Sequence, residues 1–190
     1  MPSSGFQEFR AELLELCLLS IRHGISTGRE IKVDTAEFNP ALKVRRASFV
    51  TLLKNGELRG CIGSLQATRP LVIDVARNAY AAAFTDPRFA KVSAREIQSL
   101  QIHISILSEP ENLNFSSESD LIAQLRPGID GLVLEDKGRR GTFLPTVWDV
   151  FPEPRLFLNQ LKRKAGLAES HWSERIKVAR YLTETIDGPV

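Results

Sequence analysis

The chain has 190 residues, of which 43% are hydrophobic and 25% are charged, and its formal net charge at pH 7 is +2. This size and composition are typical of one well-buried core, or of a larger and a smaller lobe, and they argue against two full domains. So small a net charge does not by itself indicate nucleic-acid binding. No apolar run is long enough to cross a membrane, and the polar first ten residues lack the pattern of a secretory signal, so we expect a cytoplasmic protein.

The two cysteines, Cys17 and Cys61, are too few and too far apart for a disulfide framework or a zinc knuckle, which agrees with a reducing compartment. Histidine, cysteine and carboxylate residues do not show the spacing of metal ligands. The sequence also lacks a glycine-rich phosphate loop between a strand and a helix. We therefore expect no metal and no other cofactor.

Apolar residues recur at helical spacing over residues 9–21, which predicts an amphipathic helix. Cys17 lies on the apolar stripe of this helix, so we expect it in the core. Residues 24–41 have no periodic pattern and contain Gly24, Gly28 and Pro40, which is typical of an ordered but irregular loop.

A β-hairpin over residues 47–65 is predicted by Asn55-Gly56, a pair that favours a two-residue type I′ turn when apolar runs flank it. If the two strands pair without interruption from this turn, Val50 lies opposite Cys61.

In that register Arg59 and Cys61 are neighbours on the same face of the second strand. Gly60 and Gly63, on either side of the cysteine, indicate a bulge or a place where another backbone or a ligand comes close. A thiol beside a guanidinium is compatible with a nucleophile of lowered pKa or with an anion-binding corner. The alternative is that Cys61 packs as a small hydrophobic residue, and the pattern alone favours that interpretation.

Thr68 and Pro70 predict the start of a second helix, whose small apolar residues suit close packing under the hairpin. Asp86-Pro87 ends this helix, because proline cannot continue it. Asp86 and Arg88 then share a rigid turn. Arg88 is equally compatible with clamping a carboxylate or phosphate of a ligand and with tying down the turn itself.

Residues 100–107 alternate between apolar and polar, which predicts a half-buried strand with His103 on its polar face. Cysteine catalysis needs a base, and His103 is the best of the three histidines for a pair with Cys61, if their strands share one sheet. A solvated or hydrogen-bonded strand histidine is the favoured alternative.

The second half of the chain contains four further predicted elements. They are a helix over residues 116–125, a hairpin of residues 132–134 and 142–144, a helix over residues 154–165 and a strand over residues 178–186. Strands joined by hairpins, with helices between some of them, predict an α+β fold with a mainly antiparallel or mixed sheet flanked by helices.

Several short motifs occur in order along the chain. They are LRGCIG at residues 58–63, DPRF at 86–89, ILS at 106–108, GIDGL at 128–132, LP at 144–145 and KAGL at 164–167, followed by Trp172. As an ordered set they resemble the AMMECR domain family, whose prokaryotic members are called AmmeMemoRadiSam system protein A. Ala90, Thr146 and Ala168 depart from the residues usual in the family, but none of them lies in LRGCIG.

The resemblance implies one domain over residues 1–190, built as two unequal lobes with a cleft between them. It also implies a system with a Memo-like protein of non-haem dioxygenase ancestry and a radical-SAM protein as partners. It carries no established activity, so whether the protein is an enzyme stays open. We expect the LRGCIG strand to bind a small anionic substrate or a partner segment in that cleft. The expected binding residues are Arg59, Gly60, Gly63, Asp86 and Arg88, and the catalytic candidates are Cys61 and His103.

Two alternatives come from other classes of function. A regulatory module that binds nucleic acid or the translation machinery would use the basic clusters at residues 43–46, 137–140 and 162–164, with Cys61 as a structural residue. Lysines suit the last turn of a helix and the tip of a hairpin, and few aromatic residues stand beside them, so we do not expect nucleic-acid binding. A scaffold that only docks the Memo-like protein would not need the thiol.

Overall fold

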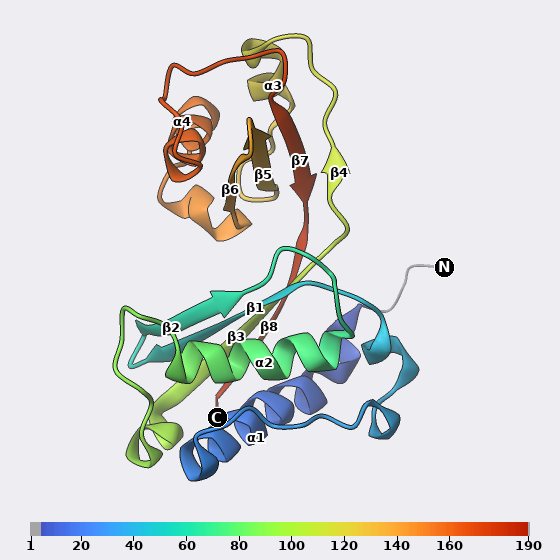
Figure 1. Ribbon diagram of the computed structural model, residues 1–190, viewed down its shortest axis with the longest axis vertical. Helices are drawn as coiled ribbons and strands as arrows, with labels where there is room; N and C mark the ends of the chain where they lie inside the picture. Colours follow the sequence, from blue (N-terminus) through green and yellow to red (C-terminus); the bar gives the residue numbers. More distant parts are fainter. Residues whose placement is uncertain (1–4, 190) are drawn as a thin grey trace. The chain divides into compact units, whose positions relative to one another are not determined.

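The computed structural model describes residues 5–189, which form two compact units (Figure 1). Of the described residues, the larger unit contains 5–107 and 184–189, and the smaller unit is Ser108–Thr183. Each unit has its own four-stranded sheet and its own hydrophobic core. The α+β fold predicted from the sequence is confirmed.

The sheet of the larger unit has the strand order β2-β1-β3-β8. Its strands are β1 (Ser48–Lys54), β2 (Glu57–Gly63), β3 (Leu100–Leu107) and β8 (Thr183–Pro189). Helix α2 (Leu71–Phe84) covers one face and packs in turn against α1 (Arg10–Thr27), as Figure 1 shows. Val50, Leu52 and Ile104 point into this core, whereas Thr51 and His103 alternate with them on the opposite face.

The first helix is longer than the apolar pattern predicts. It continues to Thr27 and ends at Gly28, whose φ of 70° is the left-handed conformation that commonly closes a helix. Gly24 keeps this last part packed, because a Cβ atom there would lie 2.3 Å from the ring of Phe84. The prediction of a loop from residue 24 is therefore wrong for residues 24–27. Cys17 is fully buried, as predicted.

Short 3-10 helices connect the larger elements of this unit. They are η1 (Phe6–Phe9), η2 (Thr35–Glu37), η3 (Pro40–Lys43) and η4 (Ala94–Ser99). The side chains of Asp34 and Asn39 cap η2 and η3 by accepting backbone N–H groups two residues later, each at 2.9 Å. Apart from these two short helices, residues 28–41 are irregular but ordered, as expected.

A buried carboxylate joins α2 to the hairpin. Asp74 is fully buried and accepts both the backbone N–H and the hydroxyl of Ser48 at 2.8 Å. Asn78 donates to the same carboxylate at 2.9 Å, and Ser64 at 2.8 Å. Because a buried charge is costly without such partners, these bonds fix α2 beneath β1.

The register of the β1-β2 hairpin differs from the predicted one. The turn forms where the sequence predicts it, but a β-bulge follows, in which Arg59 is the extra residue. Cys61 consequently pairs with Thr51 and not with Val50. One inserted residue reverses the alternation of faces in the rest of the strand. Cys61 therefore lies on the face opposite to Val50 and the core.

Gly60 lies at a close contact between α2 and β2. A Cβ atom on Gly60 would stand 2.1 Å from the backbone oxygen of Ala82. The predicted close backbone approach is confirmed at this glycine, and so is the packing of the small residues of α2 under the hairpin. At Gly63 the close neighbour is a side chain, because a Cβ atom there would meet the ring of Phe49 at 2.2 Å.

The smaller unit has a sheet of order β4-β7-β5-β6. Its elements are β4 (Glu111–Asn112), α3 (Glu118–Gln124), β5 (Gly131–Asp136), β6 (Arg139–Phe143), η5 (Pro145–Asp149), α4 (Pro154–Lys164) and β7 (Lys177–Tyr181). Trp148 stacks on Phe157 in its core, with ring centroids 3.7 Å apart, and its indole N–H donates to the backbone oxygen of Asp130 at 2.8 Å.

The predicted hairpin and the two predicted helices of this unit are present, with ends shifted by a few residues. The strand predicted over residues 178–186 is two strands instead. The chain leaves one sheet after Tyr181 and enters the sheet of the larger unit at Thr183. Both pieces show strand-like alternation, so the pattern alone did not reveal the break at Leu182.

Candidate functional site

Cys61 occupies the middle of β2 and is half-buried on the sheet face that α2 does not cover. Its cross-strand neighbour Thr51 donates a hydrogen bond from Oγ1 to the thiol Sγ at 3.2 Å. Because the neighbouring Gly60 has no side chain, β2 can pack directly against the backbone of α2. The thiol is therefore held at a defined position on a rigid strand, with one donor already directed at it.

The turn after α2 holds the peptide groups of Cys61. Asp86 accepts the backbone N–H of Cys61 on Oδ2 at 2.9 Å, and Arg88 donates from Nη2 to the backbone oxygen of Cys61 at 3.3 Å. β2 is at the edge of its sheet, where outward N–H and C=O groups have no neighbouring strand. The Asp86-Arg88 turn supplies these missing partners at the cysteine.

Asp86 and Arg88 also bind each other in a bidentate arrangement. Arg88 donates from Nε to Oδ1 at 2.9 Å and from Nη2 to Oδ2 at 2.7 Å. The Asp86 side chain is 2% exposed, and the pKa of its carboxyl lies well below its usual range, mainly because of the hydrogen bonds from Arg88 and despite burial. The same carboxylate raises the pKa of Arg88.

The guanidinium of Arg88 is only partly used by these contacts. Its side chain is 54% exposed. Its hydrogen bonds to described residues involve Nε and Nη2 but not Nη1, and its Cζ atom lies over the ring of Phe89, 5.3 Å from the centroid. An exposed guanidinium edge fixed by a buried carboxylate, beside a half-buried thiol, is suited to bind a carboxylate or a phosphate.

The predicted placement of Arg59 beside Cys61 is wrong. Arg59 donates from Nε to Glu96 of η4 at 3.0 Å, and Lys54 binds the same carboxylate at 3.1 Å. The bulge turns Arg59 toward these residues, while Cys61 faces the other side of the sheet. The pKa of Glu96 is held well below its usual range, mainly by Arg59. Arg59 therefore ties the hairpin to η4, and Arg88 is the arginine next to Cys61.

His103 lies on the same sheet face as Cys61 but does not contact it. Thr51 pairs with both residues, on one side through β2 and on the other through β3. Two strand spacings separate them, about 10 Å, which is too far for a hydrogen bond. The Nδ1 atom of His103 contacts Oδ1 of Asp187 at 2.5 Å instead. The expected strand neighbourhood is present, but the Cys61-His103 hydrogen bond is not.

The roles of Thr51 and Glu96 at this site were not predicted from the sequence. Thr51 gave no signal, because its role follows from the bulge. Glu96 had one, since Ser93 and Glu96 have the spacing of a capping box. The backbone N–H and the hydroxyl of Ser93 both donate to Oε2 of Glu96, each at 3.0 Å. That motif predicts a helix start, but it does not predict the partnership with Arg59.

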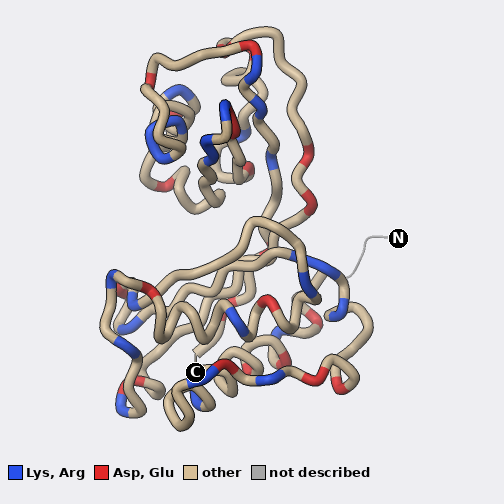
Figure 2. Tube along the Cα trace, viewed as in Figure 1, with Lys and Arg blue, Asp and Glu red and all other residues tan. Residues whose placement is uncertain are grey.

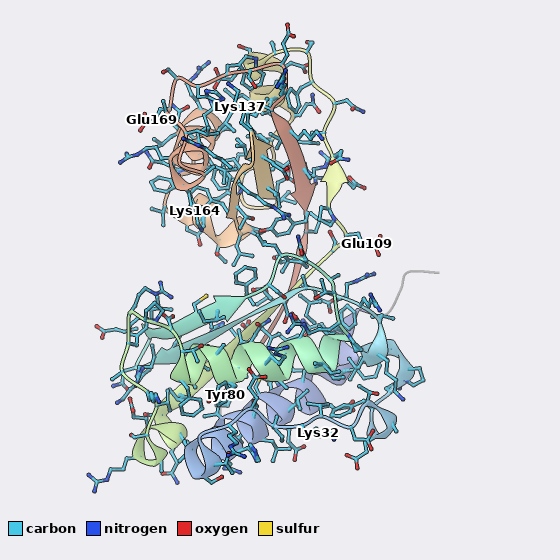
Figure 3. The ribbon with its side chains drawn as sticks, in the orientation of Figure 1. Lys32, Tyr80, Glu109, Lys137, Lys164 and Glu169 are labelled. Atoms are coloured by element: carbon cyan, nitrogen blue, oxygen red, sulfur yellow. The ribbon has the colours of Figure 1, made fainter. Side chains whose placement is uncertain are left out.

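The basic cluster at residues 162–164 contains one buried lysine and two exposed cations. The Lys162 side chain is fully buried and forms an ion pair with Glu118. Lys164, labelled in Figure 3 near the end of α4, lies 5.0 Å from the ring centroid of Phe143. Figure 2 shows Lys and Arg interspersed with Asp and Glu along the trace. In the cluster at residues 162–164, Lys162 is therefore structural, whereas Arg163 and Lys164 are exposed.

Two further features are absent from residues 5–189. No group of three or more histidine, cysteine, aspartate or glutamate residues in that range is arranged to hold a metal ion. Within the same range, no helix combines the length and the apolar character that crossing a membrane requires.

Comparison with known proteins identifies relatives along nearly the whole chain. A family model described as AMMECR1 matches residues 14–186, a range that includes Cys61, Asp86 and Arg88. A protein of Thermotoga maritima is 36% identical over 167 residues, covering 86% of this chain and 90% of the relative. A protein of Methanothermobacter thermautotrophicus is 33% identical over 160 residues, covering 82% and 81%.

A solved structure is similar as well. The crystal structure of an uncharacterized protein from Pyrococcus horikoshii has a TM-score of 0.86 and 29% sequence identity, and the match covers 97% of this chain and 98% of that one.

Proposed function

This chain belongs to the AMMECR1 family, and we propose that it binds a small anionic ligand at the Cys61 strand, in a manner that depends on the thiol. In this proposal Arg88 binds the anionic group, Asp86 positions Arg88, and the Cys61 thiol contacts the ligand. The proposal needs only residues of the larger unit, and it makes no claim of catalysis.

The arrangement of Arg88 is the observation that carries the proposal. Its guanidinium is fixed by the buried carboxylate of Asp86 and by the backbone oxygen of Cys61, yet 54% of its side chain is exposed. A cation that is already oriented loses little conformational freedom when it binds an anion, which favours affinity. Gly60 and Gly63 help indirectly, because they let β2 lie close to α2 and to Phe49.

The accessibility of the Cys61 thiol supports its place in the proposed site. Cys61 is half-buried, whereas the other cysteine, Cys17, is fully buried in the core. Thr51 donates a hydrogen bond to Sγ, which fixes the position of the sulfur in this half-buried side chain.

The proposal extends to the partners that the family resemblance implies. An acidic segment of a Memo-like protein or of a radical-SAM protein offers the same carboxylate group as a small ligand. If such a segment is the occupant, a purified partner binds the wild-type chain and loses affinity for the Arg88→Ala variant. Equal affinity for both chains contradicts this extension and leaves the small-ligand proposal to be tested separately.

Calorimetric titration of the folded protein with inorganic phosphate and with acetate tests the central proposal. We expect saturable binding that weakens about tenfold in Arg88→Ala, equivalent to one guanidinium contact. Arg77→Ala is the matched control, because Arg77 is 50% exposed and also pairs with one carboxylate, Glu30. Alkylation of Cys61 with iodoacetamide is expected to weaken binding as well. Equal effects of the two arginine variants would show nonspecific attraction and refute the site.

A further inference from the structure

The smaller unit contains a buried carboxylate oxygen without a hydrogen-bond partner. Asp136 lies at the end of β5, and its side chain is fully buried. Oδ2 contacts Nε2 of His171 at 2.5 Å and accepts the hydroxyl of Ser173 at 3.1 Å. Oδ1 has no hydrogen-bond partner among residues 5–189. A buried polar atom left in this state is costly, so Oδ1 points to a donor that these residues do not supply.

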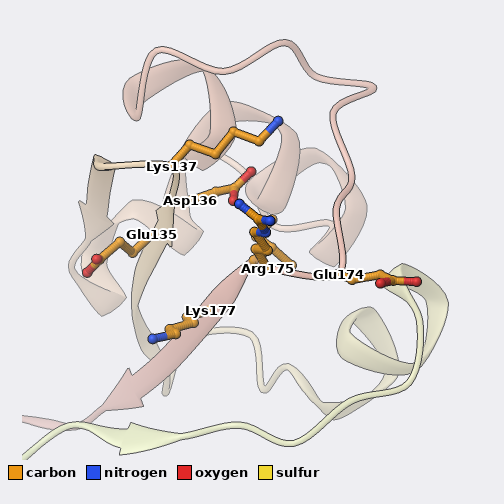
Figure 4. Close-up of a pocket in the computed structure, with 7 residues that line it drawn as sticks. Glu135, Asp136, Lys137, Glu174, Arg175 and Lys177 are labelled. Carbon is orange, nitrogen blue, oxygen red and sulfur yellow. The ribbon is translucent and has the colours of Figure 1, made fainter.

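Asp136 lines a surface pocket of about 420 Å³, shown in Figure 4. One wall is the β5-β6 turn, and the other is the segment of residues 174–177 that leads into β7. Ile176, which is 6% exposed, adds apolar surface. The volume falls within the range of small-molecule sites, about 300–1,000 Å³.

The charges around this pocket favour a ligand that carries one positive and one negative group. Glu135 and Lys177 lie directly opposite each other on β5 and β7, so their charges compensate. Figure 4 shows Glu174 pointing away from Asp136, and Lys137 and Arg175 on either side of it. The pKa of Asp136 is lowered mainly by the hydrogen bond with His171, and also by the charge of Lys137. The pocket is therefore lined by one buried anion, whose Oδ2 already contacts His171 and Ser173, and by two exposed cations.

We propose that this pocket binds a small zwitterion of the α-amino acid class. The ammonium group of the ligand donates to Oδ1 of Asp136, and its carboxylate binds Arg175 and Lys137. A ligand with only a positive charge leaves both basic side chains unmatched, and one with only a negative charge meets the buried carboxylate. Oδ1 is buried in the structure, so the proposed contact requires the residues around Oδ1 to shift when the ammonium group enters. The site is independent of Cys61 and of the function proposed above.

Nuclear magnetic resonance titration of the intact, isotope-labelled protein tests this assignment directly. The probes are glycine and L-alanine, with acetate and methylamine as analogues that carry only one of the two charges. We expect saturable shifts of the backbone signals of residues 135–137 and 173–177 with the amino acids, and binding at least about tenfold weaker with either analogue. Amino acids that bind no better than acetate would overturn the proposal.

Variants separate the site from general surface charge. Arg175→Ala is expected to weaken binding of L-alanine about tenfold, whereas Arg163→Ala, an arginine that is 62% exposed on α4, leaves it unchanged. Asp136→Asn keeps the shape of the side chain but removes its charge, and is expected to abolish binding. If this variant fails to fold, the two arginine variants decide. Equal effects of Arg175→Ala and Arg163→Ala would mean that water alone satisfies Oδ1.

Discussion

The carboxylate of Asp86 accepts the backbone N–H of Cys61 at 2.9 Å, although the two residues are 25 positions apart in the sequence. Arg88 completes this link by donating to the carbonyl of Cys61. The edge of the sheet is thereby occupied at the cysteine, so another strand cannot pair with the sheet there. The same contacts fix the direction of the thiol and of the exposed guanidinium.

Replacing the buried carboxylate is expected to destabilise the larger unit. Asp86→Asn removes charge-assisted hydrogen bonds to Arg88 and weakens the one from Cys61, so we expect a loss of about 2–3 kcal/mol in the free energy of unfolding. Urea denaturation measures this loss. Asp187→Asn is the control, because Asp187 is 56% exposed and should contribute less than about 1 kcal/mol. Equal losses for both variants would contradict the role of Asp86.

Gly60→Ala tests the close approach of α2 to β2. The added methyl group would stand 2.1 Å from the backbone oxygen of Ala82, so the helix or the strand must move. We expect a loss of about 1–3 kcal/mol, measured by urea denaturation. Leu58→Ala, at a position 43% exposed on the same strand, should cost less than about 1 kcal/mol. A fully stable Gly60→Ala protein would show that the two backbones are farther apart.

The free energy of unfolding should depend on pH through the ionisation of Glu96. Its pKa is lowered on folding, mainly by Arg59, so its stabilising contribution is complete above the ordinary carboxyl pKa of about 4 and is lost as the pH falls toward the lowered value. The difference in unfolding free energy between wild type and Glu96→Gln should be largest near about pH 7 and shrink below about pH 5. Urea titrations across this range measure it. A difference that stays constant down to about pH 3 would contradict the ion pair with Arg59.

The two cysteines should differ in their accessibility to iodoacetamide. Cys17 is fully buried, and burial raises the pKa of its thiol, so we expect modification only after unfolding. Cys61 is half-buried and should react in the folded protein. Mass spectrometry after timed exposure measures both rates, and protein unfolded in urea provides the reference. If both thiols are inert until unfolding, Cys61 is a packing residue.

The sequence predicts the local elements around the site well, since each has a signal within a few residues. Asn55-Gly56 specifies the turn of the hairpin, and Asp86-Pro87 marks the end of helix α2. Even the close approach at Gly60 is indicated, because a glycine inside a strand has few other reasons to be there.

The partners of Cys61 are not predictable in the same way. A bulge depends on what surrounds the strand, here Glu96 for Arg59 and the backbone of α2 for Gly60, and both partners lie more than twenty residues further along the chain. Gly60 and Gly63 indicate a bulge or a close approach, but they do not give the position of the bulge, and uninterrupted pairing assigns the wrong arginine to the thiol. The contact of Arg88 with Cys61 needs the tertiary fold, because nothing in the turn itself specifies the strand that it binds.

The most direct test of the anion site compares two alkylating reagents on one thiol. Iodoacetate is negatively charged and iodoacetamide is neutral, so the ratio of their rates at Cys61 reports local attraction for anions and is independent of how much of the thiol is ionised. We predict a ratio in the folded wild-type protein well above that of the unfolded chain, and a fall toward the unfolded value in Arg88→Ala but not in Arg77→Ala. A ratio that does not change when Arg88 is removed would contradict an anion-binding site at Cys61.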